Sequence, residues 1–189
     1  MPRAGLSADV LVAEAARLVD RDGVGALTLR ALAEHFGVAQ PSLYKHIAGL
    51  DDLHGRLAVV AAQDLGAALR RAASGKAGAD ATAAVAAAYR GYARRHPGCY
   101  SYLLRPRTGD DAHASASAEV VAVLGDVLAG YGIVAEEELV DAIRFLRSAL
   151  HGFVSLETAG GFAMPRSAER SFDRTVRAVD AALRDWAAV

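Results

Sequence analysis

Apolar residues recur at intervals of three and four through most of this chain, and no other feature constrains its fold as strongly. Leu11, Ala15 and Leu18 show the pattern near the N-terminus. Such intervals place side chains on one face of a helix, whereas a half-buried strand needs apolar and polar residues in alternation. The β-branched residues do not alternate with polar ones in this way. We therefore predict an all-α protein.

Capping residues, glycines and prolines divide the helical pattern into about nine segments. Ser7, Thr28 and Asp51 are suited to begin helices as N-caps, and Gly37 is suited to end one. The predicted helices cover residues 7–22, 28–36, 39–47, 51–74, 81–96, 99–104, 112–131, 136–159 and 167 to near the C-terminus, with a loop at residues 105–111.

Composition and termini exclude several classes of protein. Hydrophobic residues make up 53% of the 189 residues, but much of this is alanine, and no apolar run approaches the ~20 residues of a membrane helix. The first residues lack the apolar core of a signal peptide, and the single cysteine, Cys99, has no internal disulfide partner. We expect a cytoplasmic protein that does not enter the membrane, with a buried or partly buried Cys99 thiol.

Residues 28–47 carry the most informative pattern. Two short helices are predicted on either side of a turn at Gly37. In the second helix Ala39, Leu43 and Ile47 lie four residues apart, so they should share the inward face. The residues left pointing away from the core are Gln40, Pro41, Tyr44 and Lys45. This is the arrangement of a helix-turn-helix, in which a first helix supports a second one in the DNA major groove.

The outward residues suit contacts with double-stranded DNA. Gln40 offers a donor and an acceptor to a base edge, Lys45 can bind phosphate, and Thr28 begins a helix where backbone N–H groups can hold a phosphate oxygen. The predicted DNA-binding residues are Thr28, Arg30, Gln40, Pro41, Ser42, Tyr44, Lys45 and His46. Arg30 and Lys45 against Glu34 leave a net charge of only +1 over residues 29–47, so a dimer is needed to double it.

Three stretches together resemble the DNA-binding domain of the tetracycline-repressor (TetR) family of bacterial regulators. They are TLRALAEHFGV at residues 28–38, AQPSLYKHI at residues 39–47 and DDL at residues 51–53, within a likeness that covers residues 7–58. The resemblance implies a helix-turn-helix domain at residues 1–54 and a helical effector-binding and dimerisation domain at residues 55–189. It also implies a homodimer that represses from a palindromic operator and leaves it when a small-molecule effector binds.

Two positions depart from the family's pattern. Ala39 stands where the family often has a serine or threonine cap, an absence that costs about 1 kcal/mol. Leu50 stands where a lysine often meets a phosphate. A second stretch, HGFVSLETAGGF at residues 151–162, resembles a C-terminal subgroup with a His-Gly pair in the penultimate helix.

The resemblance implies an effector pocket and a dimer interface in the second domain. Aromatic residues gather between residues 89 and 102, which suits a flat or lipophilic ligand. The candidate ligand-binding residues, each equally suited to the core, are Tyr89, Tyr92, Tyr100, Tyr102, Leu103, Phe145, His151 and Glu157. The candidate interface residues are Leu146, Leu150, Phe153, Phe172, Val176, Val179, Leu183 and Trp186, the last five at intervals of 4, 3, 4 and 3. The same spacing also suits intramolecular core.

The remaining polar residues indicate no catalytic centre. The six histidines show no metal-ligand spacing, and no nucleophile elbow, phosphate loop or pair of catalytic carboxylates stands out. We expect no cofactor, no metal and no enzymatic activity. The arginines Arg90, Arg94, Arg95, Arg105 and Arg107 suit an acidic ligand or, by preference, a solvated face. An activator, a ligand-independent DNA binder and a protein-binding adaptor remain as alternative functions.

Overall fold

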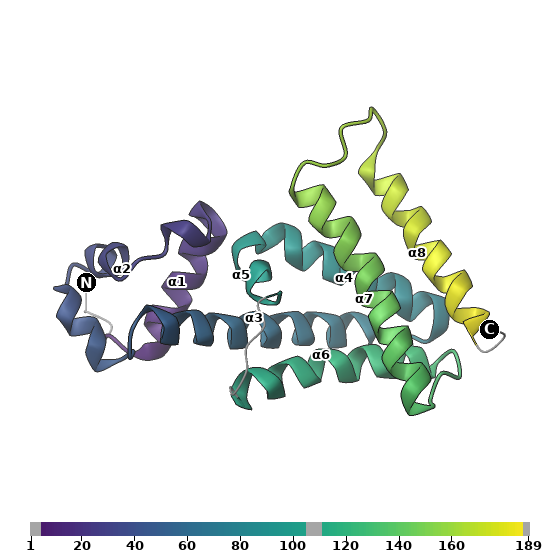
Figure 1. Ribbon diagram of the computed structural model, residues 1–189, viewed down its shortest axis with the longest axis horizontal. Helices are drawn as coiled ribbons and strands as arrows, with labels where there is room; N and C mark the ends of the chain where they lie inside the picture. The colour runs from purple at the N-terminus through teal and green to yellow at the C-terminus, as the bar shows by residue number, and fades with distance from the viewer. Residues whose placement is uncertain (1–4, 105–110, 187–189) are drawn as a thin grey trace. The chain divides into compact units, whose positions relative to one another are not determined.

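The computed structural model describes residues 5–104 and 111–186, and in these segments every regular element is helical. The elements are α1 (Ala8–Asp22), η1 (Val24–Ala26), α2 (Leu29–Phe36), η2 (Gln40–Lys45), α3 (Leu50–Ala73), α4 (Gly78–Arg95), α5 (Pro97–Tyr102), α6 (Asp111–Ala129), α7 (Glu136–Thr158) and α8 (Ala168–Arg184) (Figure 1). The all-α prediction is confirmed, and each of the nine predicted helices has a counterpart. Most of the loop predicted at residues 105–111 lies outside the described residues.

Ser7 and Thr28 cap the N-termini of helices as the sequence predicted, whereas Asp51 does not. The Oγ of Ser7 accepts the N–H of Val10 at 3.3 Å, and the Oγ1 of Thr28 accepts the N–H of Ala31 at 3.0 Å. Asp51 is not a cap, because α3 already begins at Leu50. Asp52 serves this end instead: its Oδ2 reaches back to accept the N–H of Ala48 at 2.9 Å.

The chain forms two compact units. The first comprises Met1–Ala62 and Arg95–Ala116, and the second comprises Gln63–Arg94 and Ser117–Val189. Both α3 and α6 therefore belong in part to each unit, and α5 packs with the N-terminal helices. The division into domains at residues 54 and 55 stays a prediction.

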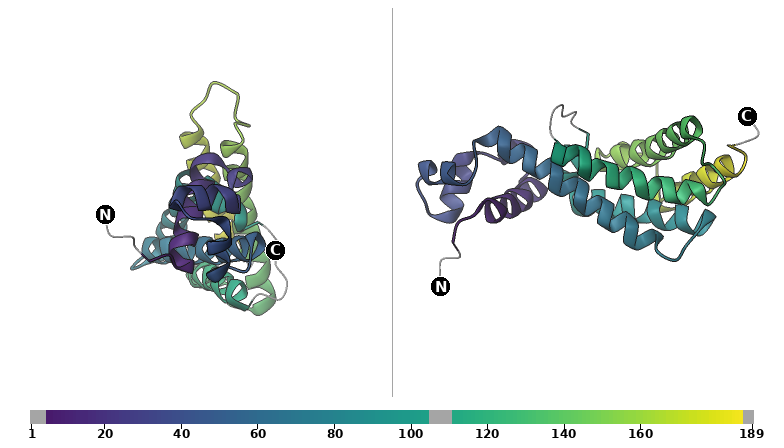
Figure 2. Two further views of the ribbon diagram at one scale, coloured as in Figure 1. Left: turned by 90° about the vertical axis from the view of Figure 1, so that its left-hand side faces the viewer. Right: turned by 90° about the horizontal axis from the view of Figure 1, so that it is seen from below.

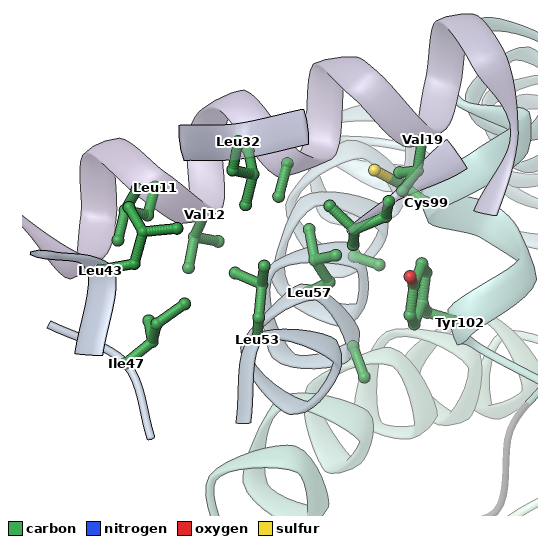
Figure 3. Packing of buried hydrophobic residues seen from close by; sticks show 14 of the residues in the cluster. Leu11, Val12, Val19, Leu32, Leu43, Ile47, Leu53, Leu57, Cys99 and Tyr102 are labelled. Carbon is green, nitrogen blue, oxygen red and sulfur yellow. The ribbon is translucent and has the colours of Figure 1, made fainter. Parts of the chain in front are cut away.

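One hydrophobic core holds the first unit together (Figure 3). Cys99 lies in it with 5% of its surface exposed, as the sequence predicted. Each fully buried leucine contributes about 1.5–3 kcal/mol through removal of apolar surface from water. The core residues come from α1, α2, the η2 segment, α3 and α5, and include Leu11, Val12, Val19, Leu32, Leu43, Ile47, Leu53, Leu57, Cys99 and Tyr102.

Helices α1 and α5 approach so closely that a side chain cannot fit between them. A Cβ added to Gly98 would lie 2.1 Å from the carbonyl oxygen of Val19. Polar contacts join the same two helices, because Asp20 accepts the N–H of Cys99 at 2.8 Å and lies 2.8 Å from Nδ1 of His96. The contact therefore depends on glycine at residue 98.

In the second unit α7 and α8 form an antiparallel pair (Figure 1, Figure 2). Aromatic rings join them, with centroids 5.1 Å apart for Phe153 and Phe172 and 5.4 Å apart for Phe145 and Trp186. A polar chain supports the pair from other helices: the hydroxyl of Tyr131 lies 2.8 Å from Oγ1 of Thr82 and donates to Oδ1 of Asp180 at 2.7 Å.

Five residues predicted at a dimer interface are intramolecular core. Their exposed fractions are 0–4% within a single chain, so a partner cannot contact them appreciably. Helical spacing indicates an apolar face but does not say which helix covers it, and here α7 and α8 cover each other. The corrected residues are Leu146, Leu150, Phe172, Val179 and Leu183; Phe153, Val176 and Trp186 are partly exposed and remain candidates.

Helix α6 is long and apolar enough to cross a membrane by length and composition alone. Its segment Ala112–Ala129 has a mean hydropathy of 1.3 over 18 residues. In the second unit this helix buries Val123 and Leu128, and its Glu119 pairs with Arg70 of α3 at 3.0 Å. These contacts are those of a helix that packs one face on a protein core, since 28% of the segment is buried.

Gly98→Ala should destabilise the protein by about 3 kcal/mol, the upper end of overpacking costs, because its methyl group would meet the Val19 carbonyl. The midpoint of urea unfolding, followed by circular dichroism, measures the loss. Gly125→Ala is the control, because its Cβ would lie 4.0 Å from Leu139 and alanine favours a helix by up to about 1 kcal/mol. Equal midpoints for the two variants would contradict the close approach of α1 and α5.

Candidate nucleic-acid interface

A left-handed glycine sets the geometry of the turn between α2 and η2. Gly37 has φ 64° and ψ 34°, a conformation that favours glycine. Its N–H donates to the carbonyl of Glu34 at 3.2 Å, and the N–H of Val38 donates to the carbonyl of Ala33 at 3.0 Å. These bonds end α2, as predicted, and reverse the chain so that η2 packs beside it.

The second element is a 3-10 helix, where the sequence predicted an α-helix over residues 39–47. Ser42 donates to the carbonyl of Ala39 at 2.8 Å and His46 to that of Leu43 at 2.9 Å, which are bonds to the third residue back. Ala39 precedes this helix with an extended backbone, so the four-residue spacing does not place it on the face of Leu43, whereas the N–H of Ile47 donates to the carbonyl of Leu43, four residues back, at 3.1 Å. Leu43 and Ile47 are buried as expected, but Ala39 is exposed, which corrects its predicted inward position.

Ala39 is the N-cap residue of this 3-10 helix. Its backbone is extended, with φ −71° and ψ 140°, and its side chain makes no capping hydrogen bond. The prediction that this helix lacks a side-chain cap is therefore confirmed. Burial of Leu43 and Ile47 compensates, because tertiary packing rather than local propensity holds so short a helix.

The eight predicted DNA-binding residues lie at the surface of α2, η2 and the residues that flank them. Tyr44 exposes 54% of its surface, which is unusual for so large an aromatic side chain. Its phenol gives the exposed face both an apolar body and a hydroxyl. The exposed members are Thr28, Arg30, Gln40, Pro41, Tyr44 and Lys45, whereas Ser42 and His46 are partly buried.

An ion pair reduces the positive charge of this face. The Nε of Arg30 donates to Oε1 of Glu34 at 2.8 Å, and both side chains are largely exposed. The Glu34 carboxylate raises the pKa of Arg30, so the guanidinium stays charged but has an anion beside it. Lys45 is the other cation between residues 28 and 47, and it is exposed.

The candidate effector residues are divided between the two units. Tyr100, Tyr102 and Leu103 belong to the first unit, whereas Tyr89, Tyr92, Phe145, His151 and Glu157 belong to the second. All four tyrosines are buried, with exposed fractions of 1–5%. The hydroxyl of Tyr102 lies 2.7 Å from Nδ1 of His54. A role for these residues in ligand binding stays a prediction.

Two of the candidates in the second unit already have polar partners. The ring nitrogens of His151 lie 3.2 Å and 3.3 Å from Oγ of Ser155, and burial lowers the pKa of His151, with Arg147 acting in the same direction. The carboxylate of Glu157 accepts two hydrogen bonds from Arg90. Among the described residues no group of three or more His, Cys, Asp or Glu side chains is placed to hold a metal ion.

Arg90 is a buried cation, where the sequence favoured a solvated face. Its Nε and Nη2 donate to the two carboxylate oxygens of Glu157 at 2.8 Å and 2.6 Å, and its Nη1 donates to Glu169 at 2.7 Å. Its guanidinium carbon lies 4.7 Å from the ring centroid of Phe172, a cation–π distance. Arg94 and Arg95 are exposed, as expected, whereas Arg105 and Arg107 lie outside the described residues.

A signal for this burial was present in the sequence. Arg90 follows Ala86 by four residues and precedes Ala93 by three, and both alanines are fully buried on α4. That spacing places Arg90 on the inward face of its helix. A charge on an inward face requires a buried partner.

Comparison with known proteins extends over both units. Residues 11–53 match the family model for bacterial regulatory proteins of the tetR family, and residues 82–179 match the tetracyclin repressor-like C-terminal domain. An uncharacterised HTH-type transcriptional regulator of Mycobacterium tuberculosis, Rv0681, is 41% identical over 163 residues, which are 83% of this chain and 72% of the relative.

Two further proteins match over nearly their whole length. YobS, an uncharacterised HTH-type transcriptional regulator of Bacillus subtilis, is 31% identical over 93% of this chain and 92% of its own. The solved structure of SCO7222, a TetR from Streptomyces coelicolor, has a TM-score of 0.75 at 19% identity and covers 96% of this chain and 99% of its own. This last likeness concerns the fold.

Glu157→Gln should destabilise the protein by about 1.5–3 kcal/mol at pH 7, the range for hydrogen bonds to charged groups. Hydrogen bonds from Arg90 lower the pKa of Glu157, so its stabilisation is present above the unfolded pKa of about 4.3 and is lost as pH falls through the folded pKa. Urea unfolding at pH 7, 5, 4 and 3 measures the difference between wild type and variant, which should shrink below about pH 4.

The exposed Glu136, in the first turn of α7, provides the matched control for this titration. Glu136→Gln should leave stability within about 0.5 kcal/mol of wild type at each pH. A Glu157→Gln difference that stays constant down to pH 3 would show that Arg90 does not hold the carboxylate in its ionised form.

Proposed function

The chain belongs to the TetR family of bacterial transcriptional regulators, and from that premise we propose that it is a repressor released from a palindromic operator by a small-molecule effector. As a member of this family the protein is a cytoplasmic DNA-binding regulator and not an enzyme. Regulators of the family bind DNA operators and small-molecule effectors. The observation that carries the proposal is the exposed face of η2, fixed on the core by Leu43 and Ile47.

In this proposal η2 enters the major groove and reads base edges. Gln40 suits a bidentate contact with adenine, and Pro41 offers an apolar surface to a thymine methyl. Tyr44 and Lys45 contact phosphates on the same face, where both are exposed. Thr28 and Arg30 add phosphate contacts at the start of α2, where the backbone N–H groups of the first turn are directed at an anion.

A homodimer is part of the proposal because one copy carries little charge. Two η2 elements about 34 Å apart would reach successive major grooves on one side of the duplex. The outer face of α7 supports pairing there: Val140 and Leu156 expose 42% and 53% of their surfaces. The exposed Ser148 and Gly152 lie between them, eight and twelve residues after Val140, and small residues permit close approach of a symmetric partner.

Release from DNA would follow from a shift between conformers. Suppose that an effector binds more tightly to a conformer in which the two η2 elements have another separation. It then lowers operator affinity by the ratio of its own affinities for that conformer and for the DNA-binding conformer. Helix α3 belongs to both compact units, so it is the element we expect to carry the change. The His-Gly pair at His151 and Gly152 supports the assignment to a C-terminal subgroup, which belongs to the same proposal.

Selection of bound duplexes from a random pool at low salt tests the proposal. We expect enrichment of a palindrome whose half-sites lie about 10 bp apart from centre to centre. A reporter on the selected site then gives the direction of regulation: deletion of the regulator gene raises expression for a repressor and lowers it for an activator. An adaptor that binds only proteins would enrich no sequence, and that outcome would overturn the proposal.

Glu34→Gln should strengthen operator binding, because it removes the carboxylate that neutralises Arg30. The salt dependence of the dissociation constant should become steeper by up to about 0.9 per additional phosphate contact. Asp141→Asn is the matched control, since it breaks an equally exposed pair with Arg144 on α7. Equal affinities for both variants, in fluorescence anisotropy over a salt series, would argue against a phosphate contact by Arg30.

Lys45→Ala and Gln40→Ala should weaken binding in different ways. Loss of Lys45 should lower affinity for all duplexes similarly and reduce the salt slope by about 1, because a phosphate contact carries no sequence information. Loss of Gln40 should cost about 1–3 kcal/mol at one base position and relax specificity there. Binding to the selected operator and to single-base variants of it separates the two, and identical profiles would contradict the assigned roles.

A further inference from the structure

A groove in the second unit has a buried arginine at its floor. It lies between α4 and α8 and has a volume of about 360 Å³. Ala83, Ala87 and Gly91 form one wall, and Phe172 and Val176 form the other. This volume is within the range of about 300–1,000 Å³ for small-molecule sites. None of the eight candidate effector residues lines the groove.

The guanidinium of Arg90 is held differently by its two carboxylates. The carboxylate of Glu157 accepts hydrogen bonds from both Nε and Nη2 of Arg90, and its side chain is only 17% exposed. The carboxylate of Glu169 accepts one hydrogen bond, from Nη1 of Arg90, and its side chain is 66% exposed. Glu157 therefore holds Arg90 in place from outside the groove lining, whereas Glu169 is a rim residue whose carboxylate can move into water at small cost.

We propose that this groove binds a small organic carboxylate with an apolar tail, whose carboxylate replaces that of Glu169 on Arg90. The Glu169 carboxylate marks the position of the anion, because it already bonds Nη1 at 2.7 Å. The apolar walls suit the tail, since the alanines, Phe172 and Val176 bury hydrocarbon without needing hydrogen bonds. The proposal goes beyond DNA binding and does not rest on it.

Arginines outnumber carboxylates in the lining of the groove. Arg94 and Arg177 line it with Arg90, against Glu169 and Asp173, and Glu157 pairs with Arg90 from outside the lining. When a ligand carboxylate displaces Glu169, Arg90 keeps two anionic partners and no buried charge is left unpaired. A cation would have to approach three arginines, and a neutral molecule would not replace the charge-assisted hydrogen bond that Glu169 makes.

Displacement would also change the attachment of α8. Arg90 ties α4 to Glu157 near the end of α7 and to Glu169 in the first turn of α8. A ligand in the groove breaks the hydrogen bond between Arg90 and Glu169 and leaves those between Arg90 and Glu157. The expected structural response is therefore confined to the start of α8.

Octanoate is a suitable probe, with octanol as the neutral control, and isothermal calorimetry on the full chain without DNA measures both. We expect octanoate to bind and octanol not to bind. Glu169→Gln should tighten octanoate binding by about three- to tenfold, because a neutral amide competes less well for Arg90. Glu136→Gln, which removes an exposed carboxylate elsewhere, should leave the affinity unchanged.

A second variant fills the groove itself. Ala87 is exposed, so Ala87→Trp should fold normally and abolish octanoate binding. Ala122→Trp places the same side chain at an exposed position on α6, outside the groove, and should bind octanoate like wild type. The proposal is overturned if octanoate does not bind to wild type, if Ala87→Trp binds it normally, or if Glu169→Gln and Glu136→Gln have equal affinities.

Discussion

The burial of Leu43 and Ile47 is the constraint on which the DNA-facing surface depends. Their side chains are 0% and 3% exposed, and they hold a six-residue 3-10 helix that has no side-chain cap. A helix of this length is not stable in water by itself. Because packing fixes Leu43 and the following Ile47 inward, the remaining side chains of η2 are available for contacts outside the protein. Binding surface and core are therefore two faces of one short segment.

The first unit combines this surface with helices from distant parts of the chain. The core that receives Leu43 also contains Cys99 and Tyr102 from α5. The α1–α5 contact tolerates no side chain at Gly98. The rigidity of the DNA-facing element thus depends on a segment about fifty residues further along the chain. The second unit depends instead on a charge, since Arg90 joins α4 to both α7 and α8.

Much of the fold and part of the candidate site follow from local sequence signals. Periodicity located every described α-helix and the η2 segment but not the short η1, and Ser7, Thr28 and Gly37 marked helix ends through hydrogen bonds that span only a few residues. The exposed positions of Gln40, Pro41, Tyr44 and Lys45 were also predicted correctly. The exposed position of Ala39 was not, because the four-residue spacing assumes that Ala39 is helical, whereas it is the extended N-cap residue of η2.

The sequence by itself determined the all-helical class, the approximate helix boundaries and the segment that carries the exposed polar face, because these depend on near neighbours along the chain. Only the tertiary structure decided what covers each apolar face. Leu146, Leu150 and Leu183 were suited equally to a dimer and to a core, and they are buried within a single chain. It also decided the role of Arg90, whose partners Glu157 and Glu169 lie 67 and 79 residues away. The spacing of Arg90 from buried alanines indicates an inward face, but the partners of its charge are brought together only by the fold.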